Sequence, residues 1–258
     1  MASRSGIRNY RFSFNLFITP GVQWLLIANA AVYIFEVLLQ TFSGPSAYTW
    51  FIGHFGLVPS AVFPGLRIWQ PFTYLFLHEN FWHILTNMFV LFMFGRELEL
   101  AWGRNRFLQY YFLTGVGAGL INVIVKVALF WGQPASYIAT IGASGAIFGV
   151  LLACAILFPD RQVVMFPIPI KMSMRTFVIV MTALEFLGTF GLGGDNISHI
   201  CHLGGMLIGY LYLRRDSYLF RLRNEVSDWK YQRNRKKFDV YINKNKNEPP
   251  SRPDRWVN

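Results

Sequence analysis

The stretch Gly142-Ala143-Ser144-Gly145-Ala146-Ile147-Phe148-Gly149 decides the fold, and the stretch His202-Leu203-Gly204-Gly205-Met206-Leu207-Ile208-Gly209 has a similar pattern. In each, one reactive side chain precedes glycines spaced four residues apart within a long apolar segment. Glycines with this spacing share one helix face and let a neighbouring helix backbone approach closely in lipid. The two stretches therefore predict two packed membrane helices that hold Ser144 against His202.

The composition favours a membrane protein over a soluble one. Hydrophobic residues make up 53% of the chain and charged residues only 14%, whereas a soluble domain carries about 25% charged residues. The two cysteines, Cys154 and Cys201, both lie in apolar segments. They indicate neither a disulfide framework nor a metal site.

Six apolar windows are long enough to cross about 30 Å of hydrocarbon. They run from Gly21 to Leu39, Phe72 to Phe94, Phe107 to Trp131, Tyr137 to Phe158, Met172 to Phe190 and Ile197 to Leu213. We therefore expect an all-α polytopic membrane protein, a bundle of six transmembrane helices. Residues 1–20 are predicted to be a cytoplasmic segment, residues 21–213 the membrane domain and residues 214–258 a basic cytoplasmic tail.

Positive charge sets the predicted orientation. Of the 24 Lys and Arg residues, 13 follow position 213, and most others flank the same side of the six windows. The excess of Lys and Arg marks the cytoplasmic face, so both termini are expected there. Because the basic tail directly follows an apolar segment, it is interpreted as a cytoplasmic flank and no nucleic-acid partner is predicted.

Polar residues within membrane spans are candidates for function. The second window contains His83 and Asn87, four residues apart, and the sixth contains His199 and His202, three apart. Ser144 is expected six residues into the fourth window, roughly 9 Å below its outer start. The predicted orientation places all of these in the outer half of the membrane.

Each polar residue also has a structural interpretation when taken alone. A serine in a membrane helix bonds to its own backbone, and an asparagine or a histidine links neighbouring helices. Glu36 and Glu185, in the first and fifth windows, have no neighbouring motif and are interpreted as packing or interface residues.

The combined motifs resemble those of the rhomboid family of intramembrane serine proteases. The resemblance rests on Gly142-Ala143-Ser144-Gly145, on His202 with Gly205 and Gly209, and on His78, His83 and Asn87. It implies a six-helix, rhomboid-like bundle with a water-filled cavity open to the outside, and a Ser-His dyad without an aspartate. No cofactor and no metal are implied.

The resemblance assigns roles to residues. Ser144 and His202 would be catalytic, and Asn87 and His83 would stabilise the oxyanion. The residues expected to pack around them are Gly142, Gly145, Phe148, Gly149, His199, Gly205 and Gly209, with His199 near Asp195. The chain departs from the family at Trp69-Gln70, where many members have Trp-Arg, and at Phe148, where many have tyrosine.

The predicted function is an intramembrane serine endopeptidase that cleaves transmembrane segments of membrane proteins near the outer face. The partners are such substrates and the lipid bilayer, and the predicted location is the bacterial inner (plasma) membrane. Two alternatives stay open. One is a catalytically inactive rhomboid-like protein that binds or escorts membrane proteins, and the other is a transporter or channel with a histidine proton relay. The sequence names neither the substrate nor the oligomeric state.

Overall fold

The computed structural model describes residues 17–165, 170–189 and 199–215. Asp195 and residues 216–258 lie outside the described residues. Of two compact units, Met1–Tyr210 and Leu211–Asn258, the first contains the helices α1 to α8 and the β-hairpin.

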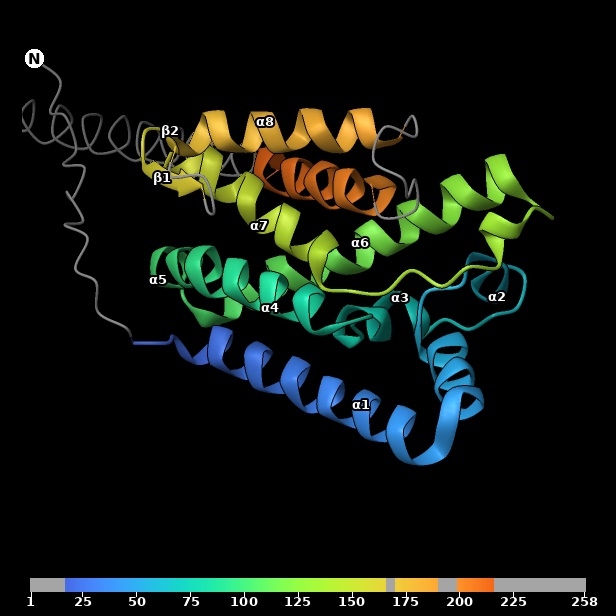
Figure 1. Ribbon diagram of the computed structural model, residues 1–258. Coiled ribbons are helices and arrows are strands. Elements are labelled where there is room, and N and C mark those ends of the chain that lie inside the picture. Colours follow the sequence, from blue (N-terminus) through green and yellow to red (C-terminus); the bar gives the residue numbers. More distant parts are fainter. Residues whose placement is uncertain (1–16, 166–169, 190–198, 216–258) are drawn as a thin grey trace, which may run out of the picture. The chain divides into compact units, whose positions relative to one another are not determined.

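Helices dominate this unit (Figure 1). They are α1 (Pro20–Phe55), α2 (Pro59–Val62), α3 (Gln70–Thr73), the 3₁₀ turn η1 (Tyr74–Phe76), α4 (Phe81–Val90), the π-helical turn η2 (Leu91–Gly95), α5 (Arg96–Trp102), α6 (Arg104–Phe130), the 3₁₀ turn η3 (Pro134–Ser136), α7 (Ser144–Leu157) and α8 (Met174–Leu187). A further helix covers residues 199–215. The strands β1 (Gln162–Met165) and β2 (Ile170–Ser173) pair antiparallel, with Val163 opposite Met172.

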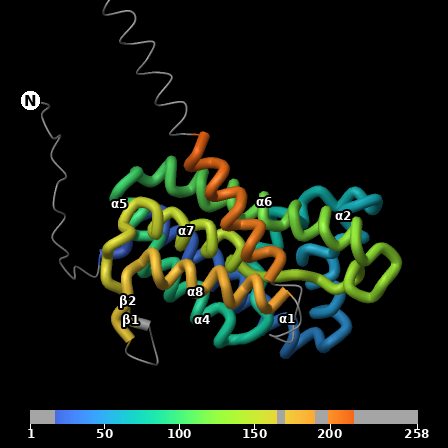
Figure 2. The backbone as a smooth tube through the Cα atoms, turned by 90° about the horizontal axis from the view of Figure 1, so that it is seen from above, coloured from blue at the N-terminus to red at the C-terminus, as the bar shows by residue number. Residues whose placement is uncertain are grey.

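Helix α7 forms the centre of the unit. It packs against α6, α8, α5 and η2, and α1 and α8 lie on opposite sides of it (Figure 1). Helix α8 and residues 199–210 lie side by side (Figure 1, Figure 2), joined by the Thr182 hydroxyl and the Met206 sulfur at 3.2 Å. Helix α8 and the helix of residues 199–210 thus form a pair, and α8 packs directly against α7.

Glycines allow α7 to meet the helix of residues 199–210 backbone to backbone. A Cβ added at Gly205 would overlap the carbonyl oxygen of Gly145, and one at Gly209 would lie 3.5 Å from Gly149 Cα. A Cβ at Gly145 would lie 2.8 Å from Ala118 Cβ on α6 and 3.1 Å from Cys201 Sγ. Such contacts exclude any larger side chain, because close-packed interiors have no spare volume.

A distant carboxylate holds the start of α1. Helix termini leave backbone N–H groups without intrahelical partners, and Thr19, the residue before α1, provides no side-chain cap. The Glu99 carboxylate from α5 accepts from Gly21 N–H at 2.7 Å and Val22 N–H at 2.8 Å. It thereby fixes α1 against α5.

The segment between α1 and α4 is held by buried Gln70. Its side-chain oxygen accepts from Val58 N–H at 2.9 Å, and its amide nitrogen donates to the Gly53 carbonyl at 3.0 Å and the His54 carbonyl at 3.2 Å. Arg67 donates to the same Gly53 carbonyl at 2.8 Å. Glutamine thus makes backbone contacts at the position where many members of the family have arginine.

Two helices, α1 and α6, are long and apolar enough to cross a membrane. The six predicted windows are helical over most of their described length, but the other helices are shorter or interrupted, so a count of six spans stays a prediction. The β-hairpin departs from the all-α expectation; its four-residue strands follow the end of α7, where β-branched Val163 and Val164 suit extended backbone.

Several predicted helix bounds were wrong. Helix α1 continues past Leu39 to Phe55, because the chain kinks at Gly44 (φ 80°) and resumes with Pro45. The second window is broken between η1 and α4. The fourth helix begins at Ser144 rather than near Tyr137, because Leu57 and Thr140 exchange backbone hydrogen bonds of 2.9 Å that keep the preceding chain extended.

The contact between Gly205 and Gly145 predicts that one added methyl group destabilises the protein at Gly205 but not at a glycine with open space around it. Gly205→Ala should lower the stability by about 1–3 kcal/mol or more, since overpacking forces helices apart. Gly53→Ala is the matched control, because a Cβ there meets nothing within 4 Å. The melting temperatures of both variants in detergent test this. A Gly205→Ala protein as stable as Gly53→Ala would contradict the backbone contact.

Candidate active site

Ser144 is the first residue of α7 and lies two residues after Gly142, a glycine with positive φ. Gly142 has φ of +120°, and its N–H donates to the Tyr74 carbonyl at 2.9 Å. The prediction that Ser144 lies six residues inside the fourth helix is therefore wrong, because α7 begins at this residue. At the helix start, the first-turn N–H groups have no intrahelical acceptor, and the helix dipole favours negative charge.

The structure brings Ser144 and His202 into hydrogen-bond contact. Ser144 Oγ and His202 Nε2 lie 2.7 Å apart, although 58 residues separate them in the chain. The Phe148 ring, one turn after Ser144, stacks on the imidazole with centroids 4.3 Å apart and planes at 16°. The stack and the hydrogen bond together hold the imidazole plane in one orientation.

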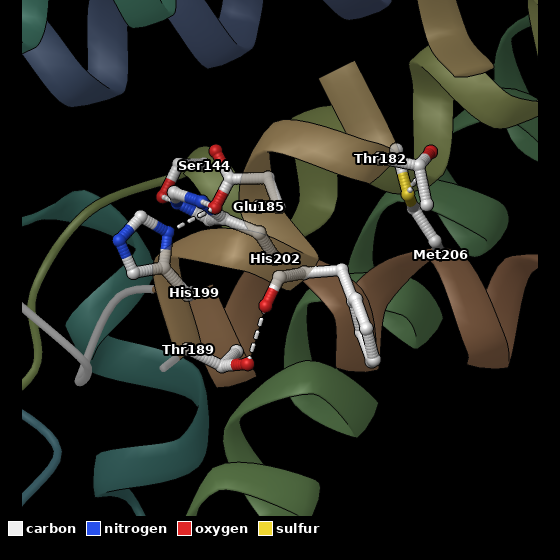
Figure 3. Close-up of polar contacts among 8 residues, drawn as sticks. Ser144, Thr182, Glu185, Thr189, His199, His202 and Met206 are labelled. Atoms are coloured by element: carbon white, nitrogen blue, oxygen red, sulfur yellow. Dashed lines mark hydrogen bonds and ion pairs between the residues drawn. The ribbon is translucent and has the colours of Figure 1, made fainter. Parts of the chain in front are cut away.

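A glutamate contacts the second ring nitrogen of His202 and also contacts His199. Glu185 Oε2 lies 2.8 Å from His202 Nδ1 and 2.6 Å from His199 Nδ1 (Figure 3). Glu185 thus lies at the interface between α8 and the helix of residues 199–215, and its contact with the two histidines is one that its interpretation as a packing or interface residue did not include. The available signal was its position in the outer half of the fifth window, level with the predicted site.

His199 lies beside His202, and among the described residues it hydrogen-bonds to Glu185 and not to Ser144. The two imidazole centroids are 6.4 Å apart with planes at 87°. A Cβ at Gly188, just past α8, would lie 2.5 Å from the His199 ring, so this glycine makes room for the histidine. The expected neighbour Asp195 lies outside the described residues.

His83 and Asn87 lie on α4 near Gly142. A Cβ at Gly142 would be 2.8 Å from His83 Nε2 and 3.8 Å from Ser144 Oγ, so the glycine lies between the two side chains. The buried Asn87 amide donates to the His83 carbonyl at 2.9 Å. Among the described residues neither side chain hydrogen-bonds to Ser144, and the oxyanion roles stay predictions.

His78 is buried beside this group. Its ring centroid lies 5.1 Å from that of His83 in an edge-on arrangement. Its backbone N–H donates to the Glu36 carboxylate at 3.1 Å. Glu36 therefore links α1 to the chain before α4, which agrees with its interpretation as a packing residue.

Glu185, His199 and His202 also form a group with metal-ligand chemistry. Their candidate ligand atoms lie within 4.8 Å of one another, and imidazole with carboxylate is a ligand set that suits Zn²⁺. The short hydrogen bonds already satisfy these atoms without an ion.

Comparison with known proteins identifies the family. A protein-family model described as "Rhomboid domain" matches residues 65–218. Three relatives are similar in sequence: "Rhomboid protein 1, mitochondrial" of Saccharomyces cerevisiae (29% identity; 53% of this chain, 38% of the relative), "Rhomboid-like protein 11, chloroplastic" of Arabidopsis thaliana (28%; 73% and 62%) and "Rhomboid protease AarA" of Providencia stuartii (31%; 53% and 52%).

The chain spans less than two thirds of the length of these three relatives. Two of their names place them in mitochondria or chloroplasts. The expected location in a bacterial inner membrane therefore finds no support in these names.

The position of Gly142 predicts that Gly142→Ala lowers the free energy of unfolding by more than backbone strain alone would. Both Gly142 and Gly132 have positive φ, but a Cβ at Gly132 meets nothing within 4 Å. A non-glycine residue in such a conformation costs of order 1–3 kcal/mol. Gly142→Ala should cost more than Gly132→Ala, because it also displaces His83. Thermal unfolding of both variants in detergent measures the difference, and equal melting temperatures would contradict the contact.

Proposed function

Since the chain belongs to the rhomboid family, we propose that it is an intramembrane serine endopeptidase that cleaves transmembrane segments of other membrane proteins near the outer face. The single observation that carries this proposal is the 2.7 Å separation of Ser144 Oγ and His202 Nε2. A serine is a weak nucleophile at neutral pH and needs an adjacent base to attack a carbonyl. The distance falls within the range required for that proton transfer.

The proposed reaction begins with His202. Its Nε2 accepts the Ser144 hydroxyl proton as Oγ attacks the peptide carbonyl, giving a tetrahedral oxyanion. The imidazolium then donates the proton to the leaving amine and the C–N bond breaks. A water molecule from the outer face, activated by the same histidine, hydrolyses the acyl-enzyme and releases Ser144.

The oxyanion would be stabilised on the side of α7 that faces α4. The Ser144 backbone N–H lies at the start of α7, and the proposed side-chain donors are the Asn87 amide and His83. Asn87 uses one N–H for the His83 carbonyl, which leaves its second N–H for an oxyanion. In a site of low dielectric constant each such donor lowers the barrier by about 3 kcal/mol.

The substrate class follows from the location of the site. Peptide bonds inside a membrane helix are shielded by their own hydrogen bonds, so we propose substrates whose transmembrane segment unwinds near the outer end. The domain organisation is part of the proposal: residues 21–213 form the membrane domain, and residues 1–20 and 214–258 lie in the cytoplasm.

The alternative functions make different use of the same residues. A catalytically inactive rhomboid-like protein that escorts membrane proteins would not need a serine hydrogen-bonded to a histidine. A proton-relay transporter would use the histidines but not Ser144. The serine–histidine contact therefore favours the protease.

The dyad proposal predicts loss of cleavage without loss of folding. Ser144→Ala and His202→Ala should each abolish cleavage of a labelled transmembrane substrate in detergent, because nucleophile or base is missing. His199→Ala should retain measurable activity, since His199 does not contact Ser144. Melting temperatures check the fold. Activity in His202→Ala together with an inactive His199→Ala would assign the base to His199 instead.

The proposed oxyanion role of Asn87 predicts that its removal slows cleavage without abolishing it. Asn87→Ala should reduce kcat by about 10²-fold without eliminating cleavage, because the donors act in parallel. Asn29→Ala is the matched control: Asn29 is a buried asparagine on α1 whose amide donates to the carbonyl four residues earlier, at 2.8 Å. Steady-state kinetics should show wild-type kcat for Asn29→Ala. Equal losses in both variants would mean that Asn87 has only a packing role.

A further inference from the structure

We propose that Glu185 is a positioning residue for His202, so that the site acts as Ser144–His202–Glu185 rather than as a dyad. This inference rests on the proposed protease function and names a third participant in the same site. The carboxylate would accept the Nδ1–H of His202 and leave the Nε2 lone pair facing the serine hydroxyl.

The contacts of His202 occupy both ring nitrogens. Nδ1 lies 2.8 Å from Glu185 Oε2 and Nε2 lies 2.7 Å from Ser144 Oγ. A neutral imidazole carries one proton, and the hydrogen bond at one nitrogen determines which tautomer is present. A carboxylate only accepts, so it selects the Nδ1–H tautomer and makes Nε2 the basic atom.

The proton movements are consistent with this role. When Nε2 takes the Ser144 proton, the imidazole becomes an imidazolium and its Nδ1–H stays on the ring. The negative carboxylate stabilises the positive charge and does not itself take a proton. Charge-assisted hydrogen bonds are roughly twice as strong as neutral ones, and the side chains of Glu185 and His202 are only 14% and 13% exposed, which limits screening by water.

His199 holds the carboxylate in place. Its Nδ1 lies 2.6 Å from the same Oε2 atom, and Gly188 leaves the space that its ring occupies. The two histidines lie one helical turn apart in residues 199–215, and the glutamate lies on α8. The carboxylate therefore has two N–H donors on one oxygen, which restricts its rotation.

The expected kinetic effect is on kcat. In Glu185→Gln the amide has no charge and can donate to His202 Nδ1, which would favour the wrong tautomer. Loss of the acidic residue in a Ser-His-acid site costs about 10⁴-fold in kcat, and we expect at least about 10²-fold here. The KM should stay unchanged, because Glu185 acts on His202 and not on the substrate.

A structural carboxylate serves as the control. Glu99 accepts from two backbone N–H groups of α1, so Glu99→Gln should lower the melting temperature and leave kcat per folded molecule unchanged. Glu185→Asp retains the charge and should keep more activity than Glu185→Gln. It also serves as the second variant if Glu185→Gln does not fold.

Chemical rescue separates a positioning role from a packing role. Formate should restore part of the kcat of Glu185→Ala, because it can supply a carboxylate to His202 Nδ1 in the space left by the side chain. Formate should not restore the cleavage activity of Ser144→Ala or of His202→Ala. A merely structural loss would not respond to formate. Cleavage by the wild type that stops with a chelator would instead assign the three side chains to a metal ion and overturn the proposal.

The outcomes distinguish this inference from the proposed function. If the wild type cleaves, Ser144→Ala does not, and Glu185→Gln shows wild-type kcat, the inference is wrong and the protease function stands. If the wild type does not cleave, or Ser144→Ala still does, the proposed function is wrong and the inference fails with it. A selective loss of kcat in Glu185→Gln, with formate rescue of Glu185→Ala, supports both.

Discussion

The backbone contact between Gly145 and Gly205 is the constraint on which the site depends. Lipid tails are as apolar as the helices, so helices associate in membranes by close packing rather than by the hydrophobic effect. A Cβ at Gly205 would overlap the Gly145 carbonyl oxygen. Because glycine has no Cβ, the helix that carries His202 can approach α7 closely enough for His202 to hydrogen-bond to Ser144. The separation of 2.7 Å is therefore a consequence of two missing side chains, one on each helix.

Polar side chains determine where the apolar helices begin and end. Glu99 satisfies the first N–H groups of α1, and Gln70 satisfies three backbone groups before α3. Each joins segments far apart in the sequence, and an unsatisfied buried group would cost about 1–3 kcal/mol. Glu185 makes the same kind of link between α8 and residues 199–202, and its acceptor atom lies beside the proposed base.

Sequence alone predicted the approach of Ser144 and His202, because glycine spacing and helix orientation are local properties. It did not predict the start of α7, since residues 137–143 are mostly apolar and the contacts that keep this segment out of a helix, Thr140 with Leu57 and Gly142 with Tyr74, involve residues far away in the chain. It also did not identify Glu185 as a partner, because the rotation of α8 about its axis depends on packing. The catalytic roles of Ser144, His202, Asn87 and His83 stay predictions.

The central claim is that Ser144 is a nucleophile activated by His202. The most direct measurement is reaction of the purified full-length protein with a fluorophosphonate, followed by mass spectrometry to identify the modified residue. The account predicts a covalent adduct on Ser144 in the wild type and none in His202→Ala. An adduct on another serine, or equal labelling of Ser144 in His202→Ala, would contradict it.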